Sequence, residues 1–139
     1  MSTIVRYRKY TDAIVTRELL FPEGAARGAR LGTEVCAIDG VTYVSLPDKA
    51  TLPGSQPEEV ADSIETVILT DELRAALKAA SPHVRLINDR VRATILERYT
   101  LEDEIQLLRT APSPEFAAYN AYVEDCLAWG RAEKAKLGL

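Results

Sequence analysis

The chain has few of the residues that build metal sites or disulfides. Its 139 residues include one His and two widely separated cysteines, Cys36 and Cys126. Without a Cys-x-x-Cys pair or a second His, neither a zinc site nor any other cofactor site is expected. Apolar runs are too short for a membrane span, and residues 1–10 lack the apolar core of a signal peptide. We therefore expect a cytoplasmic protein with reduced thiols.

Charge of one sign is in only slight excess. Seventeen Lys and Arg stand against 21 Asp and Glu, a net charge of −4, which argues against a general nucleic-acid binder. Hydrophobic residues make up 47% of the chain, as in soluble globular proteins, and the length is that of about one domain. Such a chain can fold without metals or disulfides.

Three cations near the N-terminus, Arg6, Arg8 and Lys9, lie among Tyr7 and Tyr10. Basic and aromatic residues in alternation are typical of surfaces that bind single-stranded nucleic acid. The alternative is a surface strand whose cations meet acidic side chains, and residues 33–80 hold nine Asp and Glu against three Lys and Arg. We favour the strand and keep the nucleic-acid arm as an alternative function.

Two β-rich runs within residues 34–46 flank the dipeptide Asp39-Gly40. This dipeptide suits the positive φ angles of a type I′ turn, so a β-hairpin is predicted. Both faces of the hairpin are apolar, and we expect it to be covered on one face and paired at an edge. Residues 4–10 and 64–69 are the other candidate strands, and a Pro-rich linker follows the hairpin.

Start and stop signals mark four helices in the second half of the chain. Their expected N-caps are Thr70, Ser81, Thr100 and Ser113. Apolar stripes at helical spacing are Val84, Ile87, Val91 and Ile95, and then Leu101, Ile105 and Leu108. Short connections require neighbouring helices to pack together. The prediction is an α+β protein, with a subdomain containing the β-hairpin over residues 1–69 and a helical subdomain of about four helices over residues 70–139.

Several residues could be read as catalytic, but each has a simpler interpretation. His83 falls in the first turn of a helix, with no nucleophile marked beside it, and is predicted to cap or pack. Cys126 lies between apolar positions of the last helix, where burial would leave its thiol inert. The acidic residues Glu102, Asp103 and Glu104 stabilise the positive end of a helix dipole. We therefore predict that the protein is not an enzyme.

The last helix carries two neighbouring apolar stripes. The stripe expected to face inward consists of Phe116, Tyr119, Val123 and Leu127. The second consists of Tyr119, Tyr122, Cys126 and Trp129. Such a helix is either buried on both sides or presents one stripe to a partner, and the sequence leaves both open. In the second case Tyr119, Tyr122 and Trp129 form the interface, because Tyr and Trp suit partly wet contacts.

Residues 81–139 contain three segments of note: ERYTLEDEI (97–105), the helix start SPEF (113–116) and EDCLAWGR (124–131). With them the region resembles the C-terminal part of small proteins encoded among the tail genes of phages and prophages. The resemblance implies a non-enzymatic, chaperone-like assembly factor for tail or tail fibre, or a small structural tail component. Its partner would be a tail or tail-fibre protein or a second copy of the chain. It would reside in the cytoplasm of the bacterial host or in the virion.

Overall fold

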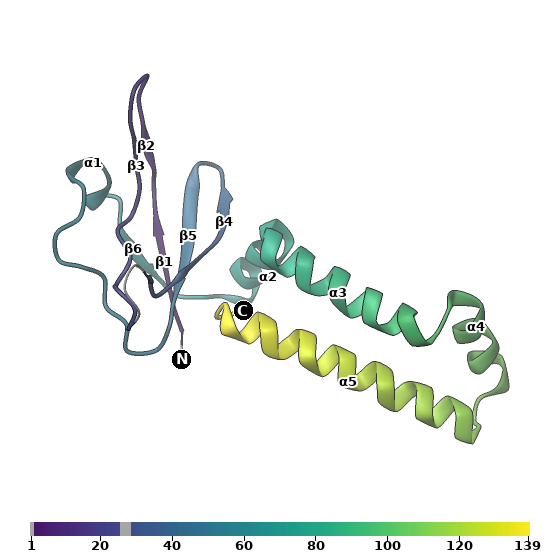
Figure 1. The fold of residues 1–139 in the computed structure, drawn as a ribbon. Helices are drawn as coiled ribbons and strands as arrows, with labels where there is room; N and C mark the ends of the chain where they lie inside the picture. The colour runs from purple at the N-terminus through teal and green to yellow at the C-terminus, as the bar shows by residue number, and fades with distance from the viewer. Residues whose placement is uncertain (1, 26–28) are drawn as a thin grey trace. The chain divides into compact units, whose positions relative to one another are not determined.

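The computed structural model describes residues 2–25 and 29–139. Strands come first and long helices last, which confirms the predicted α+β class (Figure 1). The chain forms two compact units. The sheet unit comprises Met1–Pro82 and Lys136–Leu139, and the helical unit comprises His83–Ala135. The units divide later than the expected boundary between residues 69 and 70, because the helix α2 (Asp71–Ala80) packs on the sheet.

The sheet unit contains a four-stranded sheet with the order β4-β5-β1-β6. Its strands are β1 (Thr3–Tyr7), β4 (Thr33–Ile38), β5 (Val41–Leu46) and β6 (Glu65–Val67). All neighbours are antiparallel, and β1 pairs with β5 from Thr3 opposite Leu46 to Tyr7 opposite Thr42. The strands expected near residues 4–10 and 64–69 are therefore present, and β1 is an interior strand.

The hairpin of β4 and β5 turns at Asp39 and Gly40, as predicted. Their φ angles are 51° and 78°, and two positive φ angles in succession define a type I′ turn. The pairing shifts register between Glu34 and Cys36, which allows the neighbouring residues Val35 and Cys36 both to be buried.

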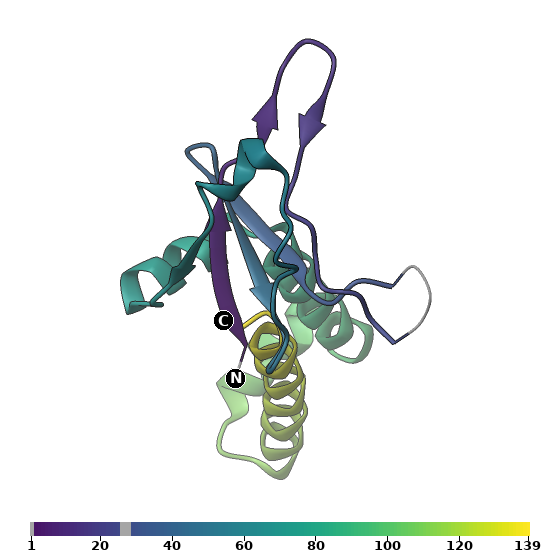
Figure 2. The ribbon, with the colours of Figure 1, turned by 90° about the vertical axis from the view of Figure 1, so that its left-hand side faces the viewer.

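A second hairpin, of β2 (Tyr10–Thr11) and β3 (Thr16–Arg17), was not expected from the sequence. It projects from the sheet unit (Figure 2). Asp12 stabilises its turn, because Oδ1 accepts the backbone N–H groups of Ile14 and Val15, each at 2.7 Å. Such local side-chain bonds are common in Asx turns.

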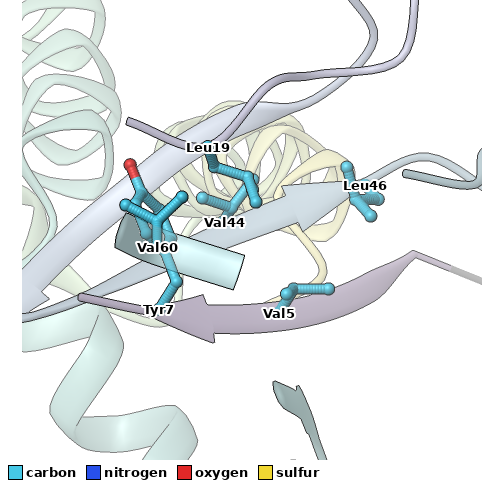
Figure 3. Packing of buried hydrophobic residues seen from close by; sticks show 6 residues of the cluster. All are labelled: Val5, Tyr7, Leu19, Val44, Leu46 and Val60. Atoms are coloured by element: carbon cyan, nitrogen blue, oxygen red, sulfur yellow. The ribbon is translucent and has the colours of Figure 1, made fainter. Parts of the chain in front are cut away.

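Apolar side chains cover both faces of the sheet rather than the single face expected for the hairpin. One cluster consists of Val5, Tyr7, Leu19, Val44, Leu46 and Val60 (Figure 3). The other consists of Ile4, Val35, Cys36, Tyr43 and Leu77. The first cluster is completed by the one-turn helix α1 (Glu58–Ala61), which forms within the Pro-rich linker and buries Val60 completely. The second is covered by α2 through Leu77.

The helical unit is built from three helices whose bounds agree with the sequence signals. They are α3 (Pro82–Arg98), α4 (Leu101–Thr110) and α5 (Pro114–Lys136). Thr100 and Asp103 form a capping box at the start of α4, with bonds of 2.9 and 3.2 Å. α3 and α5 run side by side in opposite directions, and α4 connects them (Figure 1).

Candidate protein-binding surfaces

A single narrow row of residues is buried where α3 and α5 meet. The predicted face of α3 is confirmed, because Val84 and Val91 are buried. In α5 the buried residues are Cys126 and Gly130. A Cβ built on Gly130 would lie 2.9 Å from Val91 Cγ2, so the glycine permits close approach of the two helices. Such a pair buries one seam and leaves both of its sides open.

The aromatic residues at the N-terminal end of α5 hold the unit together. Tyr119 donates a hydrogen bond of 2.8 Å from Oη to Glu104 Oε1, and Tyr122 donates one of 3.0 Å to the Thr94 carbonyl. Both rings approach Tyr99, with centroid distances of 5.0 and 5.7 Å. These contacts link α3, α4 and α5, and they leave both tyrosines partly buried.

Charges stabilise this aromatic cluster. The Arg98 guanidinium carbon lies 4.8 Å from the centroid of Tyr122 and 5.6 Å from that of Tyr99, within range of cation–π attraction. Burial raises the pKa of Tyr119, and the hydrogen bond to Glu104 raises it further. Tyr119 therefore stays protonated at neutral pH and remains a hydrogen-bond donor.

Trp129 is more exposed to solvent than Tyr119 and Tyr122. Its side chain is 42% exposed and lines an open groove of about 480 Å³ between α3 and α5. We call this the Trp129 groove. Its other lining residues include Arg90, Ala93, Thr94, Glu97, Asp125 and Cys126. The groove offers an apolar floor with charged groups of both signs at its rim. Of the three predicted interface residues, Trp129 is the most exposed.

A second open groove, of about 470 Å³, shares Val91 with the first and is otherwise lined by different residues of the same two helices and by α4. We call this the Leu127 groove. Residues that line it include Ile95, Leu96, Leu127, Glu104, Arg92, Arg131 and Lys134. Leu96 and Leu127 are 47% and 39% exposed, so this surface is also apolar at its centre.

Two parts of the expected helical core are wrong. Leu127 was expected to face inward, but the seam runs through Cys126 and Gly130, and Leu127 is turned about 100° from Cys126. The stripe of α4 is also exposed, with Leu101, Ile105 and Leu108 at 62%, 46% and 60%. Glu104 and Leu107 are the less exposed positions of that helix, which buries no residue fully.

Two of the three basic N-terminal residues, Arg6 and Lys9, form ion pairs within the sheet unit. Arg6 donates hydrogen bonds of 2.6 and 2.8 Å to Glu65, on the neighbouring strand β6. Lys9 Nζ lies 3.1 Å from both carboxylate oxygens of Glu34. The Arg8 backbone N–H bonds to Ser63, and Tyr7 is buried. The strand interpretation is confirmed for Arg6 and Lys9, which meet acidic side chains of the same chain.

The residues considered for catalysis do not converge on a site. His83 lies in the first turn of α3, and both cysteines are free and buried. Burial raises the pKa of the Cys36 thiol, which keeps it protonated. Over residues 2–25 and 29–139, no three His, Cys, Asp or Glu side chains are grouped to hold a metal ion. Within the same ranges, no helix has the length and apolar character needed to cross a membrane.

No family model matches the chain, and neither a curated protein nor a solved structure matches it.

Proposed function

We propose that this is a non-enzymatic protein of a phage or prophage tail that binds a tail or tail-fibre protein through the Trp129 groove. The observation that carries the proposal is the exposure of Trp129 beside a groove between two helices. A large aromatic side chain at the edge of an apolar groove is typical of binding hot spots. The protein would act either as a chaperone-like assembly factor in the host cytoplasm or as a small component that stays in the virion.

The tail assignment is supported by the sequence resemblance, and two of its three segments bear on the groove. The segment EDCLAWGR places Asp125, Cys126 and Trp129 along the groove, and ERYTLEDEI begins with Glu97 on its other wall. Tyr119 and Tyr122 stay candidates for the interface through the edges that their contacts within the unit leave exposed.

Nucleic-acid binding remains the alternative function, but the geometry favours it less. Two of the three cations of the proposed arm, Arg6 and Lys9, already lie in ion pairs. If these two side chains bound phosphates instead, their ion pairs with Glu65 and Glu34 would be lost. If the alternative held, DNA binding would be measurable and would weaken steeply with salt concentration.

A photo-crosslinking experiment tests the proposal. A photoreactive amino acid replaces Asp125, which lines the Trp129 groove, in infected or induced cells, and the captured proteins are identified by mass spectrometry. The matched control carries the same group at Glu72, an exposed position of α2. We expect a tail or tail-fibre protein to be captured at position 125 and not at position 72.

Binding of the captured protein is then measured with the Trp129→Ala variant. Loss of one buried aromatic side chain should weaken the complex by at least about tenfold, since such burial is worth roughly 1.5–3 kcal/mol. The circular dichroism spectrum should stay unchanged, because Trp129 is not part of the buried seam. Capture of proteins unrelated to the tail, or unchanged affinity in the variant, would refute the proposal.

A further inference from the structure

The Leu127 groove lies on the other side of the helix pair from the Trp129 groove. Leu127 and Trp129 are two residues apart on α5, which turns them by about 200° around the helix axis. Leu96 and Thr94 are related in the same way on α3 and line the respective grooves. An occupant of the Leu127 groove therefore need not compete with a partner bound at Trp129.

The apolar surface of the Leu127 groove continues onto α4. Glu104 lines the groove, and Leu101 and Leu108 are its neighbours at positions i−3 and i+4 on the surface of that helix. Both leucines are more than half exposed. With Leu96 and Leu127, which are 47% and 39% exposed, they make four aliphatic side chains that the described chain covers only in part. Monomeric proteins rarely leave such runs exposed.

Charge is distributed unequally along this surface. Arg92, Arg131 and Lys134 line the groove, whereas its carboxylate, Glu104, belongs to the acidic first turn of α4. In the part of the chain that the structure describes, neither Arg92 nor Lys134 lies in an ion pair. Arg131 approaches Glu124 only at 4.0 Å. The surface therefore has a basic end, where Arg92 and Lys134 have no ion-pair partner among the described residues, and an acidic end at Glu104.

The two charged ends lie at nearly equal distances from Leu127. Lys134 follows Leu127 by seven residues, or about 10 Å at 1.5 Å per residue. Tyr119, which holds Glu104 by a hydrogen bond, precedes Leu127 by eight residues, or about 12 Å. A two-fold axis near Leu127 and perpendicular to the groove would place the basic end of one copy on the acidic end of another.

We propose that two copies of this chain pair through the Leu127 groove about such a two-fold axis, so that α3 and α5 of each copy form a four-helix bundle. Leu96 and Leu127 lie at its centre, and the α4 leucines of each copy extend the contact. This pairing is independent of the proposed tail partner, which uses the other side of the helix pair.

The surface is large enough for a stable dimer. The face of the two helices is about 25 Å long and about 20 Å wide, and α4 adds about 15 by 10 Å. The sum is about 650 Å² per copy, within the range of specific interfaces, which bury about 600–1,000 Å² per partner. Isologous contacts of this kind close as dimers and do not propagate into filaments.

Sedimentation of the full chain with charge-reversal variants tests the pairing. We expect the wild-type chain to sediment at twice its monomer mass of 15.3 kDa. The basic-end variant Arg92→Glu/Lys134→Glu and the acidic-end variant Glu104→Lys should each dimerise at least about tenfold more weakly, because like charges then meet at two symmetric contacts. An equimolar mixture of the two variants should regain dimers, since opposite charges meet again in the heterodimer.

Leu108→Lys tests the apolar contact at a position that is 60% exposed and has no part in the core. It should weaken the dimer at least about a hundredfold, because the interface holds two copies of each side chain. Trp129→Ala is the matched control on the other side and should leave the dimer unchanged. A wild-type chain that stays monomeric at about 100 µM overturns the proposal, since a specific interface of this size associates well below that concentration. Single-end variants that are folded and dimerise like the wild type overturn it as well.

Discussion

Gly130 on α5 faces Val91 on α3 so closely that a Cβ built on the glycine would lie 2.9 Å from Val91 Cγ2. Glycine inside a helix costs about 1 kcal/mol relative to alanine, yet overpacking a tight contact costs about 1–3 kcal/mol. We therefore expect Gly130→Ala to lower the free energy of unfolding by about 1 kcal/mol in urea denaturation, despite its better helix propensity.

The same substitution should behave differently when the facing side chain is smaller. In a Val91→Ala background the added methyl group no longer meets Val91 Cγ2, and its remaining neighbour, Ile87 Cγ2, lies at an ordinary contact distance of 3.8 Å, so Gly130→Ala should be neutral or stabilising. A double-mutant cycle measures this coupling. An equal cost of Gly130→Ala in both backgrounds would mean that the two residues do not share the seam.

Gly40→Val should destabilise the sheet unit, because Gly40 has a φ angle of 78° in the hairpin turn. A β-branched residue in this region costs about 1–3 kcal/mol, which should lower the melting temperature by several degrees. Gly54→Ala is a matched control, since its added Cβ would meet nothing within 4 Å. An unchanged melting temperature for Gly40→Val would refute the type I′ turn.

Stability should fall at alkaline pH, and part of the fall should come from Tyr7. Burial raises the pKa of this tyrosine, although a hydrogen bond with the Leu19 backbone opposes the shift. The folded state therefore favours the protonated phenol. The protonated Tyr7 phenol therefore adds to the free energy of unfolding. This added stability is fully present below the pKa of an unfolded tyrosine, about 10, and is lost as pH rises through the higher pKa of the folded state.

Urea denaturation of the wild type and of Tyr7→Phe between pH 8 and 11 measures this contribution. Tyr7→Phe should be less sensitive to pH above about 10, because it has no phenol to ionise at that position. Parallel pH profiles for the two proteins would mean that the folded state does not hold the Tyr7 proton.

Both thiols should react slowly with a thiol reagent in the folded protein at neutral pH. Cys36 and Cys126 are 4% and 8% exposed, and a reagent reaches them only after local opening. Labelling in denaturant should be at least about a hundredfold faster, because the unfolded chain exposes both thiols without any local opening of the structure. The Cys36→Ala variant isolates Cys126, and rapid labelling of that variant while folded would contradict the buried seam.

Local signals in the sequence determined most of the secondary structure. Asp39-Gly40 encodes its turn by backbone preference alone, and the N-caps Thr70 and Thr100 bond to backbone N–H groups three residues on. Such features depend on neighbours in the sequence, so pattern alone predicts them. The resemblance of residues 81–139 and the alternating basic and aromatic residues of the N-terminal arm likewise suggested functions without deciding between them.

Only the tertiary structure decided which apolar stripes are covered. The pattern of α4 is equally amphipathic whether Leu101 and Leu108 face another helix of the chain or a partner. In α5, Cys126 is buried and Leu127 is not, because α3 packs against the side of the helix that carries Gly130. The glycine has no side chain, so α3 can approach closely there. The two grooves follow from this packing, and so does the exposure of Trp129. Helical periodicity determines which residues share a face, but burial depends on distant residues that the pattern does not contain.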